Sequence, residues 1–257
     1  MGSSRGVGIV IDLDMLKAQV FFGLKNNSLS AENWEEVICD ALNAEHIHGD
    51  KYLADGVLNN AVLNIKTVKI DPDELKTKEN RDFLSHPEKF GRLQELVQRR
   101  VGLPDLNDMQ ADPKLIGEKT IENFRAFEKE SFDKFNCDHT LDVIVRHGVD
   151  KTLKNYIIDV YVSKHSHPDA DELEWISCDH GSKSKYKGRS QIVGLKNNER
   201  VMARNSSGTG RQQNCYIIYK NLDKIENRYT TSVPIPSVAT FSKEKILEEI
   251  YKLETLQ

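Results

Sequence analysis

The apolar and polar positions of this 257-residue chain change their period about half-way along the sequence. Up to residue 136, most apolar positions recur at the three- and four-residue spacing of amphipathic helices. From residue 137 onward, β-branched and aromatic residues gather in short runs that are typical of strands. The pattern predicts an α+β fold, with a mixed central β-sheet flanked by helices and antiparallel strands in the second half. These strands are expected at residues 140–146, 156–162, 173–177, 191–195 and 215–219.

Two helices of the first half have recognisable starts. Ser30 is a typical N-cap, and Asp112 is a second one, with Pro113 at the first helical position. The apolar residues after the first cap recur at helical spacing, as Trp34, Val37, Ile38, Ala41 and Leu42. Residues 83–101 predict another helix, and Ser242 is expected to cap one near the end of the chain.

A tight β-hairpin is predicted within the segment from Asp55 to Lys69. Asn59 and Asn60 stand between two short apolar runs, and asparagine tolerates the positive φ that a two-residue turn needs. With the turn there, the opposed residues are Leu58 and Ala61, Val57 and Val62, Gly56 and Leu63, and Asp55 and Asn64. This register decides which side chains share a face of the hairpin.

The register brings three polar side chains to one face. Because side chains alternate along a strand, Lys66 lies with Asn64 and Asp55, while Leu63 and Ile65 turn to the other face. A carboxylate, an amide carbonyl oxygen and an ammonium group can together hold a hard divalent cation and orient a water molecule against a phosphate. The alternative is an ordinary surface hairpin whose acidic and basic side chains are solvated.

This arrangement resembles the PD-(D/E)xK nucleases, in particular the type II restriction endonucleases. In that family an Asp and an acidic-x-Lys pair lie on neighbouring antiparallel strands, and an upstream helix often adds a Glu. The pattern here reads Asp55 and then Asn64-Ile65-Lys66. It departs from the family in having Asn at the acidic position and no Pro before Asp55.

The resemblance implies a role for each residue of the hairpin. Asp55 would bind Mg²⁺, and Asn64 and the Ile65 carbonyl would complete the metal's ligands. Lys66 would orient or help to deprotonate the attacking water and stabilise charge on the phosphate. Glu35 falls at the edge of the buried stripe of its helix, so it either faces the hairpin and assists or stays in solvent.

The implied protein is a single domain over residues 1–257 with an α/β-type nuclease core. Residues 1–136 would carry the catalytic hairpin, and residues 137–257 would recognise DNA. The implied activity is Mg²⁺-dependent hydrolysis of double-stranded DNA at a short specific sequence, within bacterial restriction–modification. A palindromic target would favour a homodimer, because protein symmetry then matches DNA symmetry.

A basic, Gly- and Ser-rich segment follows in the second half, from Gly181 to Arg211. Lys and Arg on loops suit the phosphate backbone of a nucleic acid, and Gln and Asn forks can read base edges. The candidate DNA-binding residues are Lys183, Lys185, Lys187, Arg189, Arg204, Arg211, Gln212, Gln213 and Asn214. A solvated loop with a chance excess of lysine is the alternative.

A repeated Cys-Asp-His tripeptide offers a possible structural zinc site. The first copy supplies Cys137 and His139, and the second supplies Cys178 and His180. Cys and His two residues apart on a strand face the same side, so the two pairs could complete a tetrahedral Zn²⁺ site. The repeat can equally be a coincidence, because its spacing matches no established zinc motif.

Composition and charge bear on the partners and location of the protein. The net charge of −4 means that a nucleic acid would have to meet a local basic patch, and no apolar run approaches the length of a membrane span. Four cysteines do not make a disulfide scaffold, so the cytoplasm is the expected location. Two other functions stay open: a non-catalytic DNA-binding regulator, and a phosphohydrolase that uses Asp12 and Asp14 after the apolar run Val7–Ile11.

Overall fold

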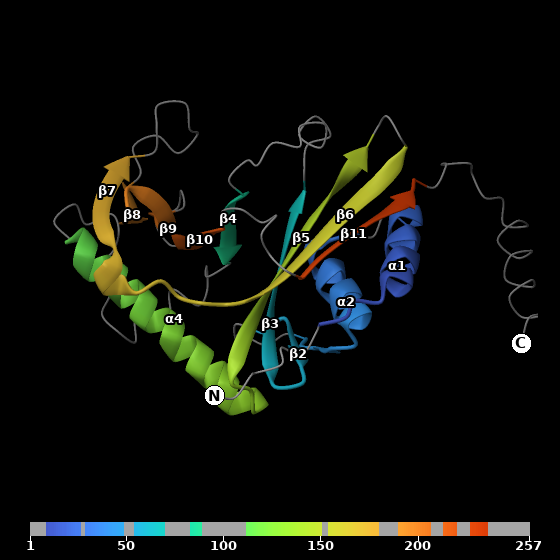
Figure 1. The fold of residues 1–257 in the computed structure, drawn as a ribbon, viewed down its shortest axis with the longest axis horizontal. Helices are drawn as coiled ribbons and strands as arrows, with labels where there is room; N and C mark the ends of the chain where they lie inside the picture. Colours follow the sequence, from blue (N-terminus) through green and yellow to red (C-terminus); the bar gives the residue numbers. More distant parts are fainter. Residues whose placement is uncertain are drawn as a thin grey trace, which may run out of the picture.

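The computed structural model describes residues 9–26, 29–48, 54–69, 83–88, 112–150, 154–179, 190–206, 213–219 and 227–235. These residues form two β-sheets, with a long helix that contacts both of them (Figure 1). The predicted α+β class is confirmed, because one sheet mixes parallel and antiparallel strands and carries packed helices. Across the described ranges, no helix is both long and apolar enough to cross a membrane.

Sheet A has six strands in the order β1-β2-β3-β5-β6-β11. Their bounds are Glu45–His46, Gly56–Leu58, Ala61–Lys69, His139–Asp150, Asn155–Lys164 and Asn227–Pro234. Strands β3 and β5 are parallel neighbours, and the other adjacent pairs are antiparallel. Parallel neighbours need a long crossover, and the chain between them includes α4, Pro113–Phe135. The sheet therefore draws strands from both halves of the sequence.

Sheet B is antiparallel throughout and has the order β4-β10-β9-β8-β7. In that order its strands cover Phe83–Glu88, Gln213–Tyr219, Glu199–Ser206, Ser190–Lys196 and Glu174–Asp179. A short 3₁₀ turn, η1, precedes β7 at Ala170–Glu172. Figure 1 shows α4 running beneath β7 and β8 toward the β2–β3 hairpin, and the helix contacts β3 and β5 as well. The helix thus holds the two sheets in one framework.

Helices α1 (Leu13–Lys25) and α2 (Ala31–Leu42) pack against sheet A (Figure 1). Ser30 caps α2 in a capping box with Asn33, as the sequence predicted for this N-cap. The predicted apolar stripe of α2 is also confirmed, because its five members are buried, namely Trp34, Val37, Ile38, Ala41 and Leu42. Burial of this stripe against the sheet is the main force that fixes α2 in place.

The alternation of side chains along β3 and β5 separates a core face from a polar face. Leu63 and Ile65 are 0% and 2% exposed and belong to the same core as α1 and α2, together with Val143 on β5. Asn64 and Asp142 therefore point to the opposite face, because neighbouring strand residues alternate. The residues of the candidate site lie on this second face.

One expectation from the sequence is wrong. Residues 83–88 form strand β4, where a helix was expected; a short apolar run fits either period, and pairing with β10 decides it. In the apolar run before Asp12, the described residues 9–11 belong to no helix or strand, and Asp12 caps α1 by accepting from two backbone N–H groups. The strand expected at residues 191–195 is confirmed as β8; it lies within the basic segment and forms a hairpin with β9, whose turn residues Asn197 and Asn198 have φ of 53° and 61°. The helix expected after Ser242 lies outside the described residues.

Gly117 is a point of close approach between α4 and sheet B. A Cβ atom built there would lie 2.2–2.4 Å from three ring atoms of Trp175 on β7. We expect Gly117→Ala to lower the free energy of unfolding by roughly 2 kcal/mol, because the clash outweighs the gain in helix propensity of about 1 kcal/mol. Urea unfolding measures the loss. In a Trp175→Ala background the same change should cost nothing, and an equal cost there would contradict the explanation.

His147 connects α2 to sheet A and should make stability depend on pH. Its ring lies 4.7 Å from that of Trp34, and its Nδ1 is 2.5 Å from the hydroxyl of Tyr156. Burial, together with the positive charge of Lys69, lowers the pKa of His147 from 6.5 to about 4. Between these values the unfolded chain binds a proton that the folded chain does not, so stability falls as the pH falls.

The expected size of this effect is set by the difference in pKa. The contribution of His147 is complete above pH 6.5 and is lost progressively down to about pH 4. Between pH 7 and pH 5 we expect a loss of about 2 kcal/mol from this residue. His147→Phe keeps an aromatic ring but does not titrate, so its unfolding free energy should fall less over the same interval. If the unfolding free energies of the wild type and His147→Phe fell equally with pH, His147 would not be the source of the pH dependence.

Candidate functional site

The predicted β-hairpin is present with the predicted register. Strand β2 pairs with β3 through Gly56 and Leu63, Val57 and Val62, and Leu58 and Ala61. Asn59 has φ of 55°, so it supplies the positive φ that the turn requires. The backbone N–H of Asp55 donates to the Leu63 carbonyl and continues the ladder by one residue.

Asp55 and Lys66 are in contact on this hairpin. Oδ2 of Asp55 lies 3.2 Å from Nζ of Lys66 and accepts a hydrogen bond of 2.6 Å from the Ile65 backbone N–H. The two side chains are 21% and 17% exposed, so solvent and a ligand can reach both of them. The carboxylate and ammonium groups that the sequence placed on one face thus meet there.

Asn64 is directed toward β5. It is 4% exposed, and its Nδ2 donates a hydrogen bond of 2.8 Å to Oδ1 of Asp142. Because a carboxylate only accepts hydrogen bonds, the nitrogen end of the amide faces Asp142, and Oδ1 is the end that can bind a cation. The N–H and C=O of one strand residue point to the same side, so the Ile65 carbonyl lies toward the strand edge that Asp55 occupies.

Glu35 and Cys39 both lie on α2, and the charge of Glu35 acts on the Cys39 thiol, which lies next to the hairpin. Cys39 is buried, and its Sγ lies 3.9 Å from the Asp55 carbonyl oxygen. Burial raises the pKa of the Cys39 thiol to about 12, and the negative charges of Asp55, Asp40 and Glu35 add to the effect. The thiol is therefore protonated and unreactive at neutral pH. Glu35 itself is half-buried.

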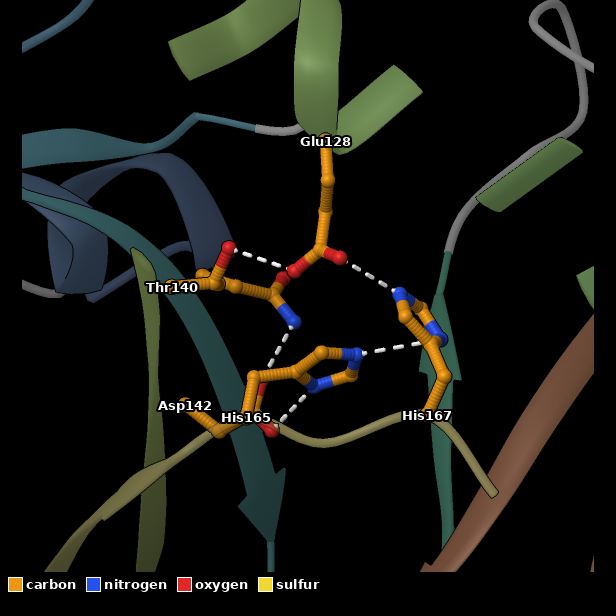
Figure 2. A network of polar contacts seen from close by, with 6 residues as sticks. Glu128, Thr140, Asp142, His165 and His167 are labelled. Atoms are coloured by element: carbon orange, nitrogen blue, oxygen red, sulfur yellow. Dashed lines mark hydrogen bonds and ion pairs between the residues drawn. The ribbon is translucent and has the colours of Figure 1, made fainter. Parts of the chain in front are cut away.

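A second group of polar side chains continues from Asp142 (Figure 2). Oδ2 of Asp142 lies 2.6 Å from Nδ1 of His165, and Nε2 of His165 lies 3.3 Å from Nδ1 of His167. Nε2 of His167 in turn lies 2.7 Å from Oε2 of Glu128 on α4. The hydroxyl of Thr140 donates to Oε1 of the same glutamate. Figure 2 shows the two rings and the glutamate converging from different parts of the chain.

This group was not predicted from the sequence. The available signal was the pair of histidines two residues apart, His165 and His167, just after the end of β6. Glu128 lies 37 positions upstream of the first of them on a helix, so no local spacing pointed to it. The ligand atoms that Glu128 and the two histidines offer all lie within 4.8 Å of one another, so together they could hold a metal ion.

The electrostatics of Glu128 favour its charged form. Burial alone would raise the pKa of this carboxyl, but the hydrogen bond and charge of His167, the Thr140 hydroxyl and the charge of His165 together lower it. The side chain is 17% exposed, and the His165 and His167 side chains are 4% and 6% exposed. A charged carboxylate thus faces two histidines that are almost completely buried.

In the first copy of the Cys-Asp-His repeat, the two candidate zinc ligands contact neighbouring residues. The thiol of Cys137 donates to the Phe135 carbonyl, and the ring of His139 contacts the carboxylate of Asp138. Each potential ligand is thus engaged by a close neighbour in sequence. The side chain of Cys178 and all of His180 lie outside the described residues.

The candidate DNA-binding residues are only partly placed. Arg204 lies on β9, and Gln213 and Asn214 lie on the adjacent strand β10, where they pair with Ser206 and Asn205. These three residues thus lie on neighbouring strands of sheet B. The remaining candidates lie outside the described residues, namely Lys183, Lys185, Lys187, Arg189, Arg211 and Gln212.

No protein family, curated protein or solved structure matches this chain. Sheet A presents a carboxylate paired with an ammonium group, an amide fixed by a buried carboxylate, and a backbone carbonyl at the same strand edge. Oxygen donors of this kind suit a hard divalent cation, and the adjacent ammonium suits a phosphate or a water next to it.

Proposed function

We propose that this protein is a Mg²⁺-dependent endonuclease that hydrolyses phosphodiester bonds in double-stranded DNA, as the type II restriction enzymes do. The observation that carries the proposal is the contact of 3.2 Å between Asp55, which directly precedes β2, and Lys66 on the antiparallel neighbour β3. A buried core of helices backs the hairpin, so the two side chains are held on a rigid element. The partial exposure of both side chains leaves them accessible to a substrate.

The oxygen donors on the hairpin fit Mg²⁺. Asp55 offers a carboxylate, Asn64 offers its amide oxygen, and Ile65 offers its carbonyl, which are all hard ligands. A bound Mg²⁺ would supply positive charge against the phosphate. Since Asn64 is neutral, Asp55 would provide the only full negative charge among the three donors.

Lys66 has two roles in this proposal. Its ammonium group positions the attacking water, and it stabilises the negative charge that develops on the phosphate oxygens. The contact with Asp55 holds the ammonium at the strand edge where the phosphate would lie. Asp142 acts indirectly, because its hydrogen bond fixes the orientation of the Asn64 amide.

Sheet B and the basic segment would supply DNA recognition. Arg204, Gln213 and Asn214 occur on two adjacent strands, and side chains of these types can read base edges in a groove. The lysines from Lys183 to Lys187 would add contacts to the phosphate backbone. A homodimer would match a palindromic target.

The experiment that tests the proposal is cleavage of plasmid and phage DNA by the purified protein with Mg²⁺. We expect discrete fragments that are absent when EDTA replaces Mg²⁺, and fragment ends that map to one short sequence. Salt-sensitive DNA binding without any strand breaks would replace the nuclease by a non-catalytic regulator. Release of phosphate from a phosphomonoester with loss in Asp12→Asn would instead favour the phosphohydrolase.

A further inference from the structure

The hydrogen-bond partners of the buried His165 and His167 determine which ring nitrogens carry a hydrogen. The Nδ1 of His165 faces one carboxylate and the Nε2 of His167 faces another, so each of these nitrogens must carry a hydrogen to donate. In a neutral imidazole the second nitrogen then has a lone pair and no hydrogen. These two lone pairs, on Nε2 of His165 and Nδ1 of His167, face each other at 3.3 Å.

Facing lone pairs in a buried site need something positive between them. The site already contains the carboxylates of Asp142 and Glu128, so with neutral histidines it has two negative charges. One shared proton would place a single positive charge between two carboxylates, and two protons would put two N–H groups opposite each other. A divalent cation balances both carboxylates and accepts both lone pairs.

The distance between the two nitrogens fits tetrahedral zinc. Two nitrogens that each lie about 2.0–2.1 Å from one tetrahedral Zn²⁺ are about 3.3–3.4 Å apart. The separation of 3.3 Å between Nε2 of His165 and Nδ1 of His167 meets this requirement. Ligating histidines also typically donate their other N–H to a carboxylate, as both rings do here.

We propose that His165 and His167 bind a Zn²⁺ ion between Nε2 of the first and Nδ1 of the second. Asp142 and Glu128 hold the two rings in place and balance the charge of the ion. Water, or Glu128 after a small rotation, fills the remaining positions, since its carboxylate belongs to the same group of ligand atoms. This site involves nitrogen ligands, does not depend on the proposed nuclease activity, and is distinct from the oxygen donors of the hairpin.

The test is metal binding by the full-length protein. After removal of metals and addition of Zn²⁺, elemental analysis of the desalted protein should find roughly one zinc per chain. Competition with a chromophoric chelator should give an affinity that falls about 10- to 100-fold in Glu128→Gln, which keeps both nitrogen ligands. His165→Ala and His167→Ala should abolish tight binding. Zn²⁺, but not Mg²⁺ at the same concentration, should raise the Tm of the wild-type protein.

The matched control is His139, one of the two histidines in the repeat that the sequence offered for zinc. His139 contacts Asp138 at the surface, so His139→Ala and Cys137→Ser should both keep the affinity of the wild type. Zinc binding that survives loss of His165 and His167 but disappears in Cys137→Ser would overturn the proposal in favour of the repeat. Absence of zinc binding by the wild-type protein would overturn it outright. Because the readout is metal content and affinity, a failure here leaves the nuclease proposal standing.

Discussion

Replacing Asp55 by alanine should lower the rate of Mg²⁺-dependent DNA cleavage by about a thousand-fold or more, because the site then loses its one charged oxygen ligand. Lys66→Ala should lower it by about a hundred- to a thousand-fold, since the charge developing on the phosphate loses its ammonium partner. Single-turnover cleavage of a plasmid with one target site measures both effects. Asp55→Asn is the sharper variant, because its amide oxygen can still accept from the Ile65 N–H while the charge is gone.

The control for these variants is an ion pair of similar type on the surface. Lys129 and Asp133 lie 2.6 Å apart on α4, and their side chains are 74% and 67% exposed. Lys129→Ala and Asp133→Ala should keep wild-type cleavage, because this pair is solvated and contributes little. Full activity after Asp55→Asn or Lys66→Ala, in protein with an unchanged circular dichroism spectrum, would refute the assignment of the hairpin as the catalytic centre.

Replacing Asp142 by alanine should cost about 3–5 kcal/mol in the free energy of unfolding. This carboxylate is completely buried and accepts from Asn64 and from the ring of His165. Its removal leaves an amide and an imidazole N–H in the interior without their partner, which is more costly than the loss of a solvated pair. Urea unfolding in the presence of EDTA measures the effect without any contribution from bound metal.

Two further variants test this explanation. Asp142→Asn keeps the size of the side chain and can still accept from Asn64, so it should lose clearly less stability than Asp142→Ala. Asp133→Ala removes an exposed carboxylate and should stay within about 0.5 kcal/mol of the wild type. A loss as small as that of Asp133→Ala would show that the buried network does not stabilise the fold.

The local parts of this molecule follow from the sequence because they depend on neighbouring residues. The Asn59-Asn60 turn between two apolar runs determined the hairpin and its register, and Ser30 determined the start of α2. Alternation along β3 was then enough to bring Asp55 and Lys66 together. The short apolar run at residues 83–88 fits the period of a helix as well as that of a strand, and pairing with the distant strand β10 made it a strand.

The sequence by itself thus determined the α+β class, the hairpin and the carboxylate–ammonium pair, because turn chemistry and side-chain alternation act over only a few residues. Only the tertiary structure brought Asn64 to Asp142, since that contact depends on the parallel pairing of β3 with β5, which lie 78 positions apart. It also placed Glu128 beside His165 and His167 through the packing of α4. Contacts between elements so far apart along the chain depend on the packing of whole helices and sheets, which no local pattern encodes.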